Sequence, residues 1–293
     1  MSLDAHERPP DHIRNAYKKY QKLRGSALDN DPQLLDLRAR TSVDQLQVVR
    51  SLSPKALGSV FRNFMPDSSC DSLAPSEEPV PVYEHRHMPE PLFIPKDPAV
   101  HKPLSITQFL NRKLRWVTLG GQYDWTQKVY PSTPSPPFPS DIGALLQGVF
   151  PDMIAQAAIV NFYSPGDTLS MHRDVSEQCD RGLVSISIGC DAIFVIGRND
   201  PSAEYSTGDP GKEQNVLAVR LRSGDAVYMS GPSRFAWHGV PQIIPETCPE
   251  LLQGWPAPST GSPGVDSNEN AYDQWGGWMR TKRINLNVRQ MWE

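Results

Sequence analysis

The chain has 293 residues and a formal net charge of −4, from 29 Lys and Arg against 33 Asp and Glu. This balance argues against a strongly basic coat protein for nucleic acids, although a local basic face would be enough to bind one. No apolar run approaches the ~18 residues of a transmembrane helix, so we expect no membrane partner. The 4 cysteines show no CxxC spacing and are interpreted as reduced thiols of an intracellular protein.

Residues 1–103 are predicted to form an N-terminal helical extension and a proline-rich linker. A helix is expected over residues 9–24, where two prolines and an aspartate are typical of a helix start and apolar residues follow at helical spacing. Another face of this helix is typical of a solvated surface, or of one that contacts phosphates, because a basic residue recurs every four positions at Arg14, Lys18 and Lys22. A second helix is expected over 53–64, a linker over 66–81, and weak structure or a short helix over 29–50.

From residue 114 onward the pattern becomes a series of short strands. They are expected at 114–119, 157–163, 169–174, 183–188, 192–196, 216–221, 224–229, 238–244 and 282–290. The eight strands from residue 157 onward with their turn signals, and a helix over 140–150, favour a mainly β sandwich or jelly roll with flanking helices. Residues 245–279 are predicted to be a long, partly disordered loop insertion, because they are rich in Pro, Gly, Ser and Asn.

Three aromatic residues, Tyr123, Trp125 and Tyr130, are expected in the loop after the first of these strands. Such rings are typical of side-chain packing at the surface of a hairpin. They are equally typical of a platform on which nucleic-acid bases stack. Both interpretations stay open from the sequence.

The stretch from Asn161 to Asp174 contains His172 and Asp174 at a spacing of two residues. On an extended segment they point the same way, so an imidazole and a carboxylate project together. An isolated histidine, His238, follows in a strand-like context. Two histidines and one carboxylate form the facial triad of non-haem iron(II) oxygenases. Taken singly, a His-x-Asp pair is more often a surface pair or a hydrogen-bonded core histidine, so the prediction depends on the order of the motifs.

The segment Lys282 to Gln290 alternates polar and apolar side chains. On a strand this gives one apolar face and one polar face with two fixed cations, formed by Arg283, Asn285, Asn287 and Arg289. Buried arginines need anionic partners. A dicarboxylate co-substrate would supply them, which agrees with an iron oxygenase.

These motifs, in this order, resemble the AlkB family of Fe(II)- and 2-oxoglutarate-dependent dioxygenases. The resemblance rests on Asn161-x-Tyr163, His172-x-Asp174, His238 and Arg283-x-Asn285-x-Asn287-x-Arg289. Within the family the chain is most similar to the eukaryotic AlkB homologue 1 group, through the segments Leu114 to Gly120, Tyr123 to Trp125, Pro137 to Asp141 and Met229 to Arg234. The resemblance covers the chain from about Leu114 to the C-terminus.

The resemblance implies a double-stranded β-helix (jelly-roll) dioxygenase core over residues 104–293. It implies that Fe(II) is bound by His172, Asp174 and His238, with dioxygen and 2-oxoglutarate at the remaining metal positions. One departure concerns the segment before this core. Family members normally carry a strand and a helix after a segment like Tyr83 to Met88, and here both are predicted to be absent, which would remove part of the sheet edge and of the substrate lid.

The resemblance also assigns the 2-oxoglutarate site. Arg283 is expected to bind the distal carboxylate of the co-substrate, with help from Tyr163 and Asn161, since arginine offers a two-nitrogen fork to a carboxylate. Arg289 is expected near the carboxylate that chelates the iron, and Asn285 completes the same polar face.

The implied reaction couples the oxidative decarboxylation of 2-oxoglutarate to succinate and carbon dioxide with hydroxylation of a methyl carbon. A methyl group on a base nitrogen that is hydroxylated in this way leaves as formaldehyde. The expected partner is therefore methylated RNA or DNA, with methyladenine in tRNA or DNA presented as a single-stranded or flipped nucleotide. From position alone, the residues predicted to line the base pocket are Arg173, Ser176 and Glu177, together with Tyr123 and Trp125.

Two other functions stay open. One is a histone or protein demethylase on the same core. The other is a nucleic-acid-binding protein or an abasic-site lyase with weak or no oxygenase activity, which would use an amine nucleophile such as lysine and no iron. A monomer is expected. The acid-rich N-terminus suits neither a signal peptide nor a transit peptide, so nucleus or cytoplasm is expected, with a mitochondrial pool implied by the resemblance.

Overall fold

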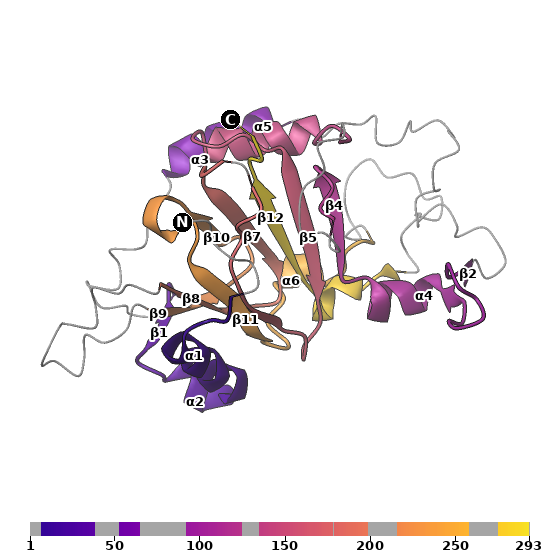
Figure 1. Ribbon diagram of the computed structural model, residues 1–293, viewed down its shortest axis with the longest axis horizontal. Helices are drawn as coiled ribbons and strands as arrows, with labels where there is room; N and C mark the ends of the chain where they lie inside the picture. The colour runs from indigo at the N-terminus through magenta and orange to yellow at the C-terminus, as the bar shows by residue number, and fades with distance from the viewer. Residues whose placement is uncertain are drawn as a thin grey trace, which may run out of the picture.

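Two five-stranded sheets pack face to face at the centre of the molecule (Figure 1). The strand order is β1-β9-β8-β11-β6 in the first sheet and β10-β7-β12-β5-β4 in the second. From β5 to β12 consecutive strands alternate between the sheets, except that β8 and β9 are neighbours in the first. This is the double-stranded β-helix, so the predicted jelly-roll core is confirmed. The computed structural model describes residues 7–38, 53–64, 92–124, 135–177, 179–198, 216–257 and 275–292.

The strands follow the period-2 patterns of the sequence closely. Their bounds are β1 Leu34–Asp36, β2 Leu92–Phe93, β3 Leu104–Ser105, β4 Trp116–Gly120, β5 Ala157–Tyr163, β6 Leu169–His172, β7 Leu183–Gly189, β8 Ala192–Gly197, β9 Val216–Leu221, β10 Ala226–Met229, β11 Trp237–Ile243 and β12 Arg283–Arg289. Apart from the three shortest strands, β1 to β3, each coincides with a strand predicted from the sequence. The ends differ by no more than 2 residues.

The helices lie outside the two sheets (Figure 1). They are α1 Asp11–Lys22, α2 Gly25–Asp29, α3 Pro54–Asn63, α4 Ile106–Gln108, α5 Ser140–Val149 and α6 Glu250–Gln253, with a π-helical turn η4 Phe109–Lys113 and 3-10 turns η6 Gly231–Ser233 and η8 Trp278–Thr281. The helices predicted over 9–24, 53–64 and 140–150 are confirmed as α1, α3 and α5. Among the described residues, every helix is too short or too polar to span a bilayer.

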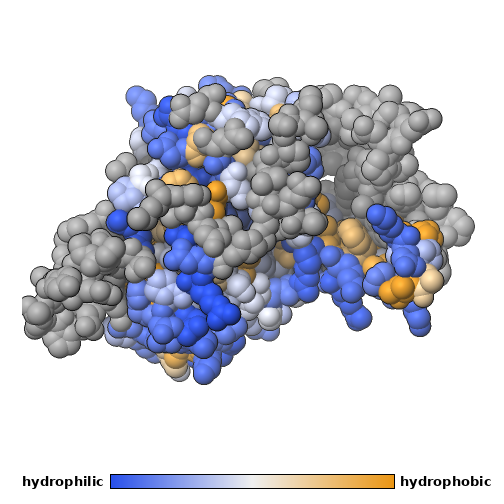
Figure 2. All heavy atoms as spheres, viewed as in Figure 1, coloured by the Kyte–Doolittle hydropathy of each residue, from blue (hydrophilic) through white to orange (hydrophobic). Residues whose placement is uncertain are grey.

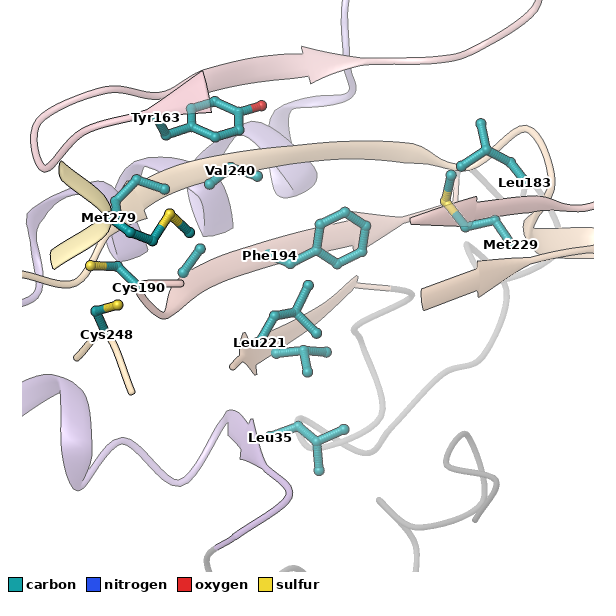
Figure 3. Packing of buried hydrophobic residues seen from close by; sticks show 13 residues of the cluster. Leu35, Tyr163, Leu183, Cys190, Phe194, Leu221, Met229, Val240, Cys248 and Met279 are labelled. Atoms are coloured by element: carbon teal, nitrogen blue, oxygen red, sulfur yellow. The ribbon is translucent and has the colours of Figure 1, made fainter. Parts of the chain in front are cut away.

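The core between the sheets is built from every second residue of the strands. Tyr163 of β5, Phe194 of β8, Met229 of β10 and Val240 of β11 belong to one buried cluster (Figure 3). Because side chains alternate along a strand, the intervening residues face outward and need a cover. The helices supply that cover on both outer faces.

Each outer face has its own helical layer, and Figure 1 shows the two layers on opposite sides of the sheets. On the first sheet, Tyr20 of α1 and Leu28 of α2 pack against Ile193 and Val195 of β8. On the second sheet, Leu146 of α5 belongs to a cluster with the outward residues Ala158, Val184 and Val288. The burial of an apolar face therefore fixes both helical layers.

The first part of the N-terminal extension joins the first sheet. β1 pairs in parallel with β9, and Arg222, the residue after β9, donates to Asp36 at 2.6 Å. The expectation of weak structure or a short helix over 29–50 was wrong for residues 34–36, while residues 39–50 lie outside the described part. Leu34 and Leu35 are buried, so a tertiary contact rather than local propensity makes this strand.

The basic face of α1 is exposed at Arg14, Lys18 and Lys22. Figure 2 shows hydrophilic atoms over this helical layer. Arg14 pairs with Asp11 of its own helix at 2.5 Å, as on an ordinary solvated face. A phosphate contact by this face stays a prediction.

Three predictions fall wholly or partly outside the described residues. The first is the absence of a strand and a helix after Met88, because residues 65–91 lie outside the described part. From Leu92 the chain forms the β2–β3 pair and α4 before β4. The linker over 66–81 also lies outside it. In the insertion over 245–279, residues 258–274 lie outside it as well, while α6 and η8 form its ends and Met279 is buried.

Replacing Gln242 should detach the end of α1 from β11. The buried Gln242 side chain donates through Nε2 to the carbonyl oxygens of Tyr20, at 2.5 Å, and Leu23, at 3.1 Å. Gln242→Ala leaves both carbonyls without this donor, so we expect a loss of about 2 kcal/mol in the free energy of unfolding, measured by urea denaturation. The control Gln21→Ala, on the exposed side of α1, should stay within about 0.5 kcal/mol. Equal effects in the two variants would contradict this role.

Candidate active site

Strand pairing brings the two predicted histidine ligands together. In the antiparallel pair of β6 and β11, His172 lies directly opposite His238, and their ring centroids are 4.3 Å apart. Asp174 follows β6 by two residues, and its Oδ1 lies 3.5 Å from His172 Nε2. The possible ligand atoms of His172, Asp174 and His238 all lie within 4.8 Å of one another. The predicted triad is thus one cluster.

Both histidines present the same ring nitrogen to this cluster. His172 Nδ1 lies 2.9 Å from the carbonyl oxygen of Ser170, and His238 Nδ1 lies 3.1 Å from that of Ala236. A carbonyl oxygen only accepts, so each Nδ1 carries the proton. The lone pair is then on Nε2, which is the arrangement found in metal-binding histidines.

The electrostatics keep His238 and Asp174 in the state that binds a cation. Burial, with a smaller contribution from the neighbouring His172, lowers the pKa of His238 to about 4, so this ring is neutral at neutral pH. Burial alone would raise the pKa of Asp174, but Arg289, the two histidines and Arg234 outweigh it and hold that pKa well below its usual range. A neutral His238 and an ionised Asp174, with Nε2 of His172 in the same cluster, match the donor set of Fe(II).

A second polar site lies on the inner face of the second sheet. Arg283 is 1 % exposed and donates to Ser187 Oγ at 2.7 Å and to the carbonyl oxygen of Cys190 at 3.3 Å. Its Nε and the hydroxyl of Tyr163, directly opposite it on β5, are buried without a hydrogen-bond partner. Within the described part of the chain, Arg283 pairs with no carboxylate. Two orphaned donors beside a buried cation fit the carboxylate of a co-substrate.

Burial shifts both groups of this site. It lowers the pKa of Arg283 to about 10, and Tyr163 partly offsets the effect. It raises the pKa of Tyr163 to about 12, against the pull of Arg283. The guanidinium therefore stays charged and the phenol stays protonated at neutral pH, so both act as donors to an anion.

The remaining predicted residues of this face are partly committed to the sheet. Asn285 donates to Ser185 Oγ at 2.8 Å and to the carbonyl oxygen of Ile186 at 3.1 Å. Asn161 lies opposite Asn285 on β5. Arg289, at the far end of β12, donates to Asp174 Oδ2 at 3.1 Å, so it stands beside the triad as expected.

The sequence matches the 2OG-Fe(II) oxygenase superfamily over residues 82–289. The chain belongs to this superfamily. It is 54% identical over 217 residues to the N6-methyladenosine RNA demethylase ALKBH of Cryphonectria parasitica, covering 74% of this chain and 92% of that protein. This coverage and identity place it in the AlkB family, and its cofactors are those of the superfamily, Fe(II), 2-oxoglutarate and dioxygen.

Two further relatives lie in the AlkB homologue 1 group. The chain is 44% identical over 198 residues to the tRNA demethylase abh1 of Schizosaccharomyces pombe, covering 65% of this chain and 57% of that protein. It is 32% identical over 209 residues to the human nucleic acid dioxygenase ALKBH1, covering 67% of this chain and 50% of that protein. The chain thus spans about half the length of these two relatives.

The residues predicted to contact the base lie in different places in the structure. Tyr123 and Ser176 come together, with 3.3 Å between the hydroxyl of Tyr123 and Oγ of Ser176. Trp125 lies outside the described residues. A tryptophan that the sequence analysis passed over, Trp116 of β4, lies opposite Asn161 and is 43 % exposed. It therefore continues the inner polar row of Asn161 and Asn285 toward the solvent, which its alternation within β4 would have indicated.

Arg173 and Glu177 both take part in ion pairs, and their contact with a base stays a prediction. Arg173 pairs with Glu7 and lies 4.7 Å from the ring centroid of Trp237. Because His172 and Asp174 share one side of the extended segment, the residue between them points to the other side. Glu177 is buried in ion pairs with Arg289 and Arg234. The sequence analysis assigned Arg234 no role of its own, and it was named only as the last residue of the segment Met229 to Arg234.

The stability of the metal-free AlkB-family chain should fall as the pH drops from about 6.5 toward 4. The pKa of His238 is about 4 when folded and about 6.5 in an unfolded chain, so between these values only the unfolded chain binds the proton. The lowered pKa therefore reduces the free energy of unfolding by about 3 kcal/mol over this window. Urea denaturation at several pH values measures the effect. His238→Gln should remove it, and an identical pH dependence in both proteins would contradict it.

Proposed function

We propose that this protein is an Fe(II)- and 2-oxoglutarate-dependent oxidative demethylase of methylated nucleobases, with N6-methyladenine in RNA as its first substrate to test. The observation that carries the proposal is that the His172, Asp174 and His238 cluster shares one jelly roll with the buried Arg283, which pairs with no carboxylate among the described residues. A metal site and an anion site in the same interior are what an oxygenase with a dicarboxylate co-substrate requires.

The donor atoms define how the co-substrate would be held. His172, Asp174 and His238 would bind Fe(II), and Arg283 with Tyr163 would bind the distal carboxylate of 2-oxoglutarate. When bound, Fe(II) supplies the activation of dioxygen that couples decarboxylation of 2-oxoglutarate to hydroxylation of the substrate methyl group. The hydroxymethyl group then leaves the base nitrogen as formaldehyde.

The protein's own part in this reaction is orientation and the exclusion of water. The carbonyl oxygens of Ser170 and Ala236 fix the tautomers of the two histidines. The apolar cluster around Phe194, which lies 6.0 Å from the ring of His238, keeps the inner end of the site dry. Fixed donors in a dry site are worth more than the same groups in water.

The choice of a nucleobase rests on the relatives and on the mouth of the site. Proteins whose names include N6-methyladenosine RNA demethylase, tRNA demethylase and nucleic acid dioxygenase align with this chain. Trp116 carries an exposed ring opposite Asn161, and Tyr123 lies against Ser176, two residues after Asp174. Both rings suit the stacking of an unpaired base. We also propose that the protein acts as a monomer, since all the candidate ligands come from one chain.

The decisive test measures formaldehyde and succinate from the purified chain with Fe(II), ascorbate, 2-oxoglutarate and a stem-loop RNA containing N6-methyladenine. We expect both products from the wild type and neither from His172→Ala, because removing one of three ligands abolishes the metal site. The same oligonucleotide as DNA and a methylated lysine peptide separate nucleic-acid demethylation from protein demethylation. Strand cleavage at an abasic site that persists with a chelator would instead support the lyase alternative.

Arg283→Lys should weaken the use of 2-oxoglutarate while leaving the metal site intact. Lysine keeps the charge but loses the planar fork that binds a carboxylate through two nitrogens, so the KM for 2-oxoglutarate should rise about tenfold or more. The measurement is succinate formation over a range of 2-oxoglutarate concentrations. Arg14→Lys is the control, because Arg14 is exposed and pairs with Asp11 of its own helix. An unchanged KM in Arg283→Lys would remove Arg283 from the co-substrate site.

A further inference from the structure

Asp174 of the triad forms a closed ring of contacts with three other charged residues, Arg289, Glu177 and Arg234. Arg289 contacts Asp174 Oδ2 through Nη2, at 3.1 Å, and Glu177 Oε1 through Nη1, at 3.2 Å. Arg234 contacts Glu177 Oε2 through Nη2, at 3.1 Å, and donates through Nη1 to the main-chain oxygen of Asp174, at 3.0 Å. A fifth contact, from Arg234 Nε to the carbonyl oxygen of Arg181 at 2.7 Å, anchors the ring to the loop after the ligands.

The ring is buried and electrically balanced. The side chains of Glu177 and Arg234 are each 1% exposed, and that of Arg289 is 5% exposed. Two guanidinium groups face two carboxylates, so no net charge is left in the interior. Removing one member would leave an uncompensated buried charge, which forces its neighbours to find new partners.

The positions of the contacts restrict what Arg289 offers to Asp174. An arginine facing a carboxylate ordinarily binds both of its oxygens with two nitrogens. Here the ion pair with Glu177 uses Nη1 of Arg289, and the hydrogen bond to Asp174 runs from Nη2 to Oδ2. The other oxygen, Oδ1, is left toward the histidines, 3.5 Å from His172 Nε2.

We propose that Glu177 is a positioning residue for the metal site: by engaging Arg289 on one side it keeps Oδ1 of Asp174 available to the metal, and Arg234 holds Glu177 in that role. The inference rests on the metal ligands of the proposed function and assigns the site a control of metal affinity. Without Glu177, Arg289 turns both nitrogens to Asp174 and competes with the metal for its carboxylate.

The test is metal binding by the full chain carrying Glu177→Gln. An amide has one acceptor oxygen, so it cannot serve Arg234 and Arg289 together. Titration with Co(II), followed by its visible absorption and without 2-oxoglutarate, should give a dissociation constant about tenfold or more above that of the wild type. The matched control Asp36→Asn removes the same charge from the ion pair with Arg222 at the sheet edge and should leave Co(II) affinity unchanged.

A rescue variant separates positioning from mere stability. Lysine has a single terminal nitrogen, so Glu177→Gln combined with Arg289→Lys should bind Co(II) more tightly than Glu177→Gln alone. A folded Glu177→Gln protein that binds Co(II) within about twofold of the wild type, or a double variant without recovery, would overturn the proposal.

The remaining outcomes of this experiment are also decisive. If Glu177→Gln does not fold, Arg234→Lys replaces it, and weaker Co(II) binding in that folded variant supports the proposal while unchanged binding overturns it. Failure of both variants to fold would assign the ring to stability alone and overturn the proposal. If the wild type does not bind Co(II), the metal site itself is overturned. If the wild type binds Co(II) and the variants bind it with the same affinity, only the role of Glu177 is overturned.

Discussion

The burial of three arginine side chains is the constraint on which the interior depends. Arg234, Arg283 and Arg289 are 1 %, 1 % and 4 % exposed, and a guanidinium in such surroundings is tolerated only with compensating negative charge. Arg234 and Arg289 find it in Asp174 and Glu177, and Arg283 finds no carboxylate in the described part of the chain. The same physical requirement therefore separates an internally neutral support for the triad from a cation that needs an anionic ligand.

The geometry of the triad follows from the register of one strand pair. His172 and His238 stand opposite each other because β6 and β11 are antiparallel neighbours, and Asp174 joins them because two residues of extended chain restore the same side. A slip of β6 by one residue against β11 would turn the ring of His172 to the outer face, away from His238. The hydrogen bonds from the two Nδ1 atoms to main-chain carbonyls make each ring orientation a property of the strand itself.

The alternation of side chains made most of the fold and the ligand cluster predictable. It predicted His172 with Asp174, and the polar row from Arg283 to Arg289. Applied to Arg173, it would have placed that residue on the other face, where Trp237 lies. The partners of Glu177 were beyond reach, because Arg234 and Arg289 come from distant segments and only the packed structure shows that they meet. β1 was missed because a three-residue strand exists through its pairing with β9 rather than through a pattern of its own.

The parallel pairing of β1 with β9 has a consequence for the colloidal behaviour of the chain. β9 is flanked by β8 on one side and by β1 on the other, and its arginines are tied to Asp29 and Asp36. Without β1, β9 would become an edge strand with a free row of amide and carbonyl groups. This edge strand would carry the apolar residues Leu217 and Val219. Such an edge is a template for pairing with another molecule. The N-terminal segment thus protects the jelly roll from self-association through its own sheet, a role that is separate from any contact with substrate.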